Sequence, residues 1–236
     1  MKIHTDIHQG HEDWDKWRSV RATASEFSKI YTGGGKVSGQ RESYMRKCAV
    51  ARKYTMPTWS GNSYTDRGHD LEPVARDLFV ELSGLDVREV ACVEHDNGLC
   101  GGSPDGLIYS PNGELISGLE IKCLNYDKHI GIVTKGAVPS EHRAQVHGLM
   151  WLTGVPCWQY MVYHDEAMPF DYRVIEVEPD QYTDDLGVEM LKFCEELDQR
   201  SEEFIDDFEK SMSGVGMLDS MPVLRRHIEH RDNSVI

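Results

Sequence analysis

The chain has 236 residues, of which 39% are hydrophobic and 28% charged, and its net charge is −15 at pH 7. The length allows one large domain or two small ones, and the composition is that of a soluble globular protein with a full hydrophobic core. The longest apolar runs fall well short of the roughly 20 residues that a membrane helix needs. The N-terminal segment lacks the apolar core of a secretory signal, so we expect a cytoplasmic protein.

The charge is unevenly distributed along the chain. Residues 1–67 hold 12 Lys and Arg against 7 Asp and Glu, whereas residues 68–236 hold 13 against 33. A basic face on the first segment can bind phosphates even though the whole chain is acidic. The alternative is that this asymmetry is an ordinary solvated surface.

The six cysteines lie far apart and include no CxxC pair. This spacing argues against a zinc ribbon, a disulfide framework and an iron–sulfur cluster. We therefore expect most of the cysteines to be small core residues.

In chain order, the first helical pattern covers residues 14–31 and divides into two pieces. Thr23 and Glu26 have the spacing of a capping box, so the second piece is expected to be a helix that begins at Thr23. Residues 33–40 (GGGKVSGQ) predict a flexible loop, because they lack the spacing of a phosphate-binding P-loop. Another helix is expected around 42–54.

The strongest helical pattern covers residues 66–84. Its apolar face comprises Leu71, Ala75, Leu78, Phe79 and Leu82. Proline is tolerated in the first turn of a helix, so Pro73 places Glu72 at the helix start. Gly84 is expected to end the helix.

The remaining pattern alternates strands and helices. Strands are predicted at residues 87–95, 105–110, 118–124, 157–164 and 171–178. A helix is predicted from a cap at Ser140 to Gly154, and an acidic helix, continuing to Phe208, carries an apolar face of Leu186, Met190, Phe193 and Leu197.

This order predicts one α/β domain, residues 1–236, with a central mixed β-sheet flanked by helices. Its core would span about residues 14–180. An acidic helical region would follow at about 183–210, and then a loose tail at 212–236.

The stretch GGSPDGLIYSPNGELISGLEIKC, residues 101–123, places charged residues on strands that otherwise look buried. Asp105 and Glu120 on adjacent strands can converge on a hard cation such as Mg²⁺, with the Ile121 carbonyl as a third ligand. Lys122 points to the same face as Glu120 and can hold the attacking water. Such a site suits phosphodiester hydrolysis, whereas the alternative is a solvated strand edge. The apolar neighbours favour a buried strand, where charges must be paired or metal-bound.

Pro104–Asp105 and Glu120–Ile121–Lys122 form the P-D…E-x-K pattern of the restriction-endonuclease-like nucleases. Over residues 14 to 180 the chain further resembles the lambda-exonuclease family, the YqaJ-like phage recombination exonucleases. The segments that carry the resemblance, in the family's order, are WDKWRSVRATASEF, RGHDLEPVARDLF, SPDG, LEIKC and AQVHGLMW.

The resemblance implies a restriction-endonuclease-like core and two Mg²⁺ ions, for which Mn²⁺ can substitute. Asp105, Glu120 and the Ile121 carbonyl would be the metal ligands, and Lys122 would orient the nucleophilic water.

Two further residues are implied for the same site. Glu72 would point toward the metals or the water, and Gln145 would help to place Lys122 or the water. From the residues alone, Glu72 can instead complement the dipole at its helix start, and Gln145 can face solvent.

The resemblance also implies a pocket for the terminal 5′ phosphate, formed by Arg18, Ser25 and Ser103. Independently of it, Ser25 is predicted in the first turn of a helix, where free N–H groups favour an anion, and Arg18 offers a planar fork for phosphate oxygens. The alternative for Arg18 is a surface salt bridge with a neighbouring acid. Trp14 and Trp17 are expected to be packing residues.

The resemblance implies a metal-dependent 5′→3′ exonuclease that degrades the 5′-ended strand of linear double-stranded DNA and leaves 3′ single-stranded tails for recombination. It also implies a homotrimeric ring around DNA and a phage-type single-strand annealing protein as partner. No membrane association is expected. A phage-encoded enzyme would act in the cytoplasm of its bacterial host.

Three alternatives remain. The first is another nuclease of the same fold, either a structure-specific endonuclease or a CRISPR-associated enzyme, although the cluster cysteines of the latter are missing. The second is a catalytically silent relative that only binds DNA, against which the intact Asp105, Glu120 and Lys122 set argues. The third is a metal site built on the N-terminal histidines His4, His8 and His11.

Overall fold

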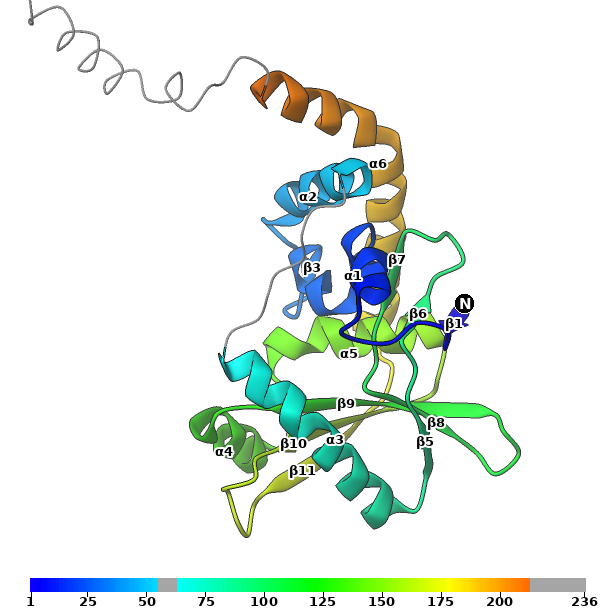
Figure 1. Ribbon diagram of the computed structural model, residues 1–236. Helices are drawn as coiled ribbons and strands as arrows, with labels where there is room; N and C mark the ends of the chain where they lie inside the picture. The colour runs from blue at the N-terminus through cyan, green and yellow to red at the C-terminus, as the bar shows by residue number, and fades with distance from the viewer. Residues whose placement is uncertain (55–62, 213–236) are drawn as a thin grey trace, which may run out of the picture.

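The computed structural model describes residues 1–54 and 63–212, and Figure 1 shows their arrangement. The helices of these residues are α1 (Glu12–Ser19), the 3₁₀ helix η1 (Ala24–Lys29), α2 (Arg41–Tyr54), α3 (Ser63–Ser83), α4 (Tyr126–Lys135), α5 (Ser140–Thr153) and α6 (Gln181–Met212). The strands are β1 (Lys2–His4), β2 (Ala22–Thr23), β3 (Tyr31–Thr32), β4 (Lys36–Val37), β5 (Asp86–Arg88), β6 (Cys92–Glu94), β7 (Cys100–Gly102), β8 (Gly106–Tyr109), β9 (Leu115–Cys123), β10 (Trp158–Tyr163) and β11 (Tyr172–Val177). None of the helices in these two ranges has the length and apolar character to cross a membrane.

The largest sheet has five strands in the order β11-β10-β9-β8-β5. β9 and β10 run parallel, and the other neighbours are antiparallel, so the sheet is mixed. A second sheet has the order β1-β6-β7-β2. β3 pairs with β4 in a short hairpin, and of the two strands only β4 lies within the predicted loop 33–40. The predicted α/β class with a central mixed sheet is confirmed.

Helices cover both faces of the five-stranded sheet (Figure 1). Successive side chains of a strand point to opposite faces. On one face, Ile121 of β9 packs in a cluster with Ala75 and Phe79 of α3. On the other face, Tyr160 of β10 belongs to the larger cluster that contains Leu149 of α5. The central strand β9 is therefore enclosed between α3 and α5.

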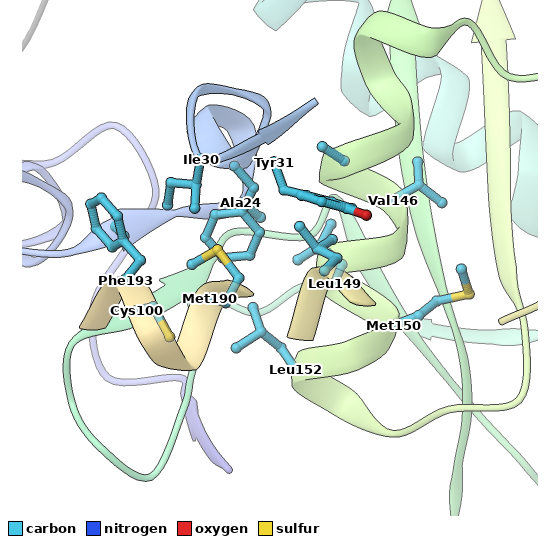
Figure 2. Packing of buried hydrophobic residues seen from close by; sticks show 14 of the residues in the cluster. Ala24, Ile30, Tyr31, Cys100, Val146, Leu149, Met150, Leu152, Met190 and Phe193 are labelled. Atoms are coloured by element: carbon cyan, nitrogen blue, oxygen red, sulfur yellow. The ribbon is translucent and has the colours of Figure 1, made fainter. Parts of the chain in front are cut away.

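The acidic helix α6 completes the larger cluster. Its predicted apolar face is buried, as confirmed for Leu186, Met190, Phe193 and Leu197. Figure 2 shows Met190 and Phe193 beside side chains of η1 and α5. The predicted tail at 212–236 lies outside the described residues, apart from Met212, which ends α6.

Cations of α2 lie against acids of α6. Arg41 pairs with Glu196, Arg46 lies 3.7 Å from Asp207, and Lys53 pairs with Glu209. Three of the 12 Lys and Arg residues of residues 1–67 are therefore paired with acids of α6. The other cations of this segment would have to form any basic face that binds phosphates.

A helix does begin after Thr23, which is its N-cap residue, but the predicted capping box is absent and the helix is of the 3₁₀ type. Residues Ala24–Lys29 form a six-residue 3₁₀ helix without a side-chain cap. The Thr23 hydroxyl lies 3.4 Å from the Ser25 hydroxyl, and Glu26 pairs with Lys29 instead of closing the capping box.

The predicted start of α3 is also wrong. The helix begins at Ser63, so Pro73 and Glu72 lie inside it. A proline inside a helix gives up one backbone hydrogen bond and strains the preceding turn, at a cost of about 3 kcal/mol. Packing of Ala75 and Phe79 against the sheet offsets this cost. Leu82, predicted on the apolar face, is exposed.

Other elements differ in extent. The strand predicted at 87–95 is two strands, β5 and β6, which belong to different sheets. Pro139, not Ser140, is the N-cap of α5, and Gly154 ends that helix with a φ of 70°. The sequence patterns indicate none of β1, β2, β7 and α4. All six cysteines are free, and four of them are buried, as expected for core residues.

Gly118 of β9 is a position where the packing admits no side chain. A Cβ added there would lie 2.2–2.5 Å from ring atoms of Trp158. Gly118→Ala is expected to lower the free energy of unfolding by about 1–3 kcal/mol, seen as a fall of several degrees in melting temperature. Gly131→Ala in α4 is the matched control, because its Cβ would meet nothing within 4 Å, and it should be neutral or stabilising by up to about 1 kcal/mol. Equal melting temperatures for the two variants would contradict the packing at Gly118.

Candidate active site

Asp105 lies immediately before β8 and beside the central strand β9. Its backbone N–H donates to the Leu119 carbonyl (3.1 Å), and its carboxylate Oδ2 accepts from the Ile121 N–H (2.5 Å). The β8–β9 ladder extends to the pair of Gly106 and Leu119, so Asp105 takes the place of a strand partner for Ile121. The N–H and C=O of one strand residue point to the same side. The Ile121 carbonyl therefore faces the region of the Asp105 carboxylate.

Glu120 and Lys122 lie on the same face of β9. Lys122 Nζ lies 2.6 Å from Glu120 Oε1, and the side-chain amide of Gln145 on α5 donates to the same oxygen. Gln145 thus reaches the site and does not face solvent. Glu120 is 1% exposed, and its other oxygen, Oε2, is buried without a hydrogen-bond partner.

The donor set fits a hard divalent cation. A buried carboxylate oxygen without a donor is costly unless a cation occupies the space beside it. Two carboxylates and a backbone carbonyl are the oxygen ligands that Mg²⁺ and Mn²⁺ prefer. Asp105, Glu120 and the Ile121 carbonyl supply that set.

The carboxylates perturb one another. Burial, and then the nearby charge of Glu72, raise the pKa of Asp105 to about 7. Burial, and then Asp105, raise the pKa of Glu120 to about 8. The effect of burial is clearest for Glu120, because Asp105 is only half-buried. Burial lowers the pKa of Lys122, but the acids Glu120 and Asp105 outweigh it and the pKa is raised, so the ammonium stays charged.

Glu72 faces this site although it lies inside α3. Burial raises its pKa, and the charges of both Glu120 and Lys122 act on it. Arg76, one turn later, donates to Glu72 Oε1 (2.6 Å) and to the Asp105 carbonyl (2.8 Å). Sequence reasoning missed Arg76. Its spacing of four residues from Glu72 is the signal that could have indicated the ion pair.

The three residues predicted for the 5′-phosphate pocket are connected through Trp14. The Trp14 indole N–H donates to the Ser103 hydroxyl (2.8 Å). The Arg18 guanidinium lies 4.3 Å from the centroid of the Trp14 ring and donates to the Ser25 hydroxyl (3.2 Å). The position of the Arg18 side chain is therefore fixed by Trp14 and Ser25, and not by a surface ion pair with a neighbouring acid. The 3₁₀ helix is too short for the predicted helix-dipole contribution at Ser25.

Trp14 is a residue whose contact role the sequence did not reveal. A half-buried indole N–H needs a hydrogen-bond partner, and Ser103 supplies it. Trp17, in contrast, is a buried packing residue as expected, with its N–H donated to Glu94 (2.8 Å).

The turn at residues 103–105 is held by side chains from three separate segments of the chain. Trp14 binds the side chain of its first residue, the Gln9 amide donates to the carbonyl of its second (3.2 Å), and Arg76 donates to the carbonyl of its third. The candidate phosphate pocket and the candidate metal ligand therefore share one fixed turn.

The half-buried His142 and the buried Tyr160 form a pair near the site. Nδ1 of His142 lies 2.5 Å from the Tyr160 hydroxyl, and Tyr160 stands opposite Glu120 in the β9–β10 ladder. Burial, and then the charge of Lys122, lower the pKa of His142 to about 4, so the imidazole is neutral at neutral pH. Sequence reasoning missed this pair, because a single histidine on a helix gives no signal.

Within residues 1–54 and 63–212, no three His, Cys, Asp or Glu side chains are gathered so as to hold a metal ion by themselves. The N-terminal histidines thus receive no support as a metal site, and His4 lies 2.9 Å from Glu94 instead. A site at Asp105 and Glu120 depends on the backbone carbonyl beside them.

The chain is similar to solved structures of exonucleases. The solved structure of LHK-Exo, an alkaline exonuclease from Laribacter hongkongensis, is similar with 27% identity and a TM-score of 0.73, covering 85% of this chain and 99% of that chain. The structure of LHK-Exo in complex with dAMP has the same identity and coverage and a TM-score of 0.71. A phage-related exonuclease from Haemophilus somnus 129PT has 18% identity and a TM-score of 0.56, with 84% and 99% covered, which shows the fold alone.

No curated protein matches the chain significantly. The family model described as the YqaJ-like viral recombinase domain matches residues 13–156, which is more than half of the chain. The chain therefore belongs to the YqaJ-like viral recombinase family.

Proposed function

We propose that the protein is a Mg²⁺-dependent 5′→3′ exonuclease that degrades the 5′-ended strand of linear double-stranded DNA and leaves 3′ single-stranded tails for recombination. The observation that carries the proposal is the convergence of Asp105, Glu120 and Lys122 beside the open edge of β9, with one buried carboxylate oxygen left for a cation. Family membership and the similarity to an alkaline exonuclease that has been seen with dAMP support it.

The metal would be held by Asp105, Glu120 and the Ile121 carbonyl, with two Mg²⁺ ions proposed and Mn²⁺ as a substitute. When bound, it would lower the pKa of water and neutralise charge on the phosphate. Lys122, held by Glu120, would orient the attacking water and stabilise negative charge as it develops. Gln145 shares the Glu120 oxygen with Lys122 and so helps to fix the position of the ammonium.

The polarity of degradation would come from the pocket of Arg18, Ser25 and Ser103. Arg18 presents a planar, charged fork that suits a terminal phosphate. Ser103 stands two residues before Asp105 in the same turn, so a bound 5′ end would lie at a fixed separation from the hydrolytic site. This arrangement favours exonucleolytic cleavage at a fixed distance from the 5′ end over endonucleolytic cleavage within a strand.

Further parts of the proposal concern assembly and surroundings. We take residues 1–236 as a single nuclease domain in which α6 shares the core of the catalytic part. A ring of three chains around DNA, a phage-type single-strand annealing protein as partner, and the cytoplasm of a bacterial host follow from the family resemblance.

Digestion of linear duplex DNA labelled at either end tests the function. With Mg²⁺, a 5′ label should appear early in small products, while a 3′ label stays in long fragments, and chelator should abolish both. Lys122→Ala should reduce the rate at least about 100-fold and leave DNA binding intact. Cleavage of closed circular DNA, early release of the 3′ label, or near-normal cleavage by the variant would contradict the proposal.

Arg18→Ala should reduce the preference for 5′-phosphorylated over 5′-hydroxyl duplex ends by about 10-fold or more, because a charged donor to the terminal phosphate is lost. The ratio of the two initial rates measures this preference. Lys16→Ala is the matched control, since Lys16 lies on the same helix in an exposed pair with Glu12. An unchanged ratio in the Arg18 variant would remove that residue from the pocket.

Metal binding should strengthen with pH. Asp105 and Glu120, with pKa values of about 7 and 8, are largely protonated at pH 6.5 and largely ionised at pH 8.5. Protons compete with the cation for these oxygens, so the Mn²⁺ affinity should rise by at least about 10-fold between the two pH values. Calorimetry in two buffers of different ionisation enthalpy should also show proton release near pH 7. Equal affinity at both pH values would contradict the shared, proton-binding site.

A further inference from the structure

Arg76 on α3 makes three contacts at the edge of the candidate site. Its Nε donates to the carbonyl oxygen of Asp105 (2.8 Å), one terminal nitrogen donates to Glu72 Oε1 (2.6 Å), and the other lies 2.6 Å from Glu89 Oε1. The side chains of Arg76 and Glu72 are 12% and 23% exposed, whereas Glu89 is 72% exposed. The pair with Glu89 is therefore screened by solvent, and the contacts with Glu72 and Asp105 are the strong ones.

The contact with Asp105 completes the fixation of that residue. The Asp105 N–H and carboxylate are both held by β9, through Leu119 and Ile121. The Asp105 carbonyl is held from α3, by Arg76. Arg76 is thus the link through which α3 determines how the Asp105 peptide is oriented relative to the sheet.

We propose that Arg76 is a positioning residue that ties Glu72 to the turn of Asp105, so that both carboxylates are placed for a divalent cation before it binds. This inference rests on the proposed function, because it takes Asp105 as a metal ligand. The planar guanidinium presents five donors in a fixed fork and can serve a carboxylate and a carbonyl at once. Groups that hold metal ligands in place commonly contribute 10- to 100-fold to metal affinity.

Two substitutions of Arg76 test whether this residue positions the carboxylates or only stabilises the fold. The ammonium of Arg76→Lys keeps the charge but cannot reproduce the fork that spans Glu72 and the Asp105 carbonyl. The amide of Arg76→Gln can donate to one acceptor but carries no charge. Calorimetric titration of the full chain with Mn²⁺, without DNA, should show at least about 10-fold weaker binding in both variants.

Two control variants are expected to bind Mn²⁺ with the same affinity as the wild-type protein. Glu89→Gln removes the charge from the exposed third contact of Arg76. Arg88→Lys alters a neighbouring exposed arginine, which pairs with Asp86. Unchanged Mn²⁺ affinity in both Arg76 variants, even with a lowered melting temperature, would overturn the positioning role. A loss in Glu89→Gln as large as that in Arg76→Lys would also overturn it, because the effect would then run through Glu89.

The same titration distinguishes this inference from the proposed function. A wild-type protein that binds no Mn²⁺, or an Asp105→Asn variant that binds it normally, would reject the metal site itself and the inference with it. Wild-type binding that is lost in Asp105→Asn but retained in the Arg76 variants would reject the inference alone.

Discussion

The hydrogen bond from the Ile121 N–H to the Asp105 carboxylate is the interaction on which the candidate site depends. It forms because β8 begins one residue after Asp105, which leaves the edge of the central strand open at Ile121. The same open edge turns the Ile121 carbonyl toward the Asp105 side chain. A strand that began two residues earlier would satisfy this edge with its own backbone and leave no place for a cation.

The burial of charge explains why the side chains around this edge form so many hydrogen bonds and ion pairs with one another. Glu120 is almost fully buried, and a buried carboxylate costs several kcal/mol unless it is paired or metal-bound. Lys122 and Gln145 supply donors to one of its oxygens, and the other oxygen keeps its capacity for a cation. The raised pKa values of Glu120 and Asp105 express the same cost, because protons partly offset the charge when no cation does. With the proposed metal role of Asp105 and Glu120, protons and a divalent cation would compete for these oxygens.

The acidic character of the chain also has a structural explanation. Helix α6 places its apolar face in the core and its acids against the cations of α2, so that Arg41 and Lys53 are neutralised within the molecule. Arg18, the proposed phosphate-binding residue, lies outside these pairs on a different helix and is stacked on Trp14.

Much of the fold and the centre of the site could be read from the sequence, because those features depend on local order. The spacing of Glu120 and Lys122 on one strand, the turn before Asp105, and the apolar periodicity of α6 are properties of short segments. Local spacing does not predict the structure where packing between distant segments outweighs local preference. Pro73 is an example, because it is tolerated inside α3 where Ala75 and Phe79 pack on the sheet.

The sequence by itself determined the α/β class, the P-D…E-x-K residues and the family resemblance. The tertiary structure alone decided which other side chains meet them: Arg76 on the Asp105 carbonyl, Trp14 on Ser103, and the acids of α6 on α2. These contacts join segments that are separated by tens of residues or more in the chain. Their geometry is fixed by how helices pack on the sheet, and no periodicity within one segment encodes it.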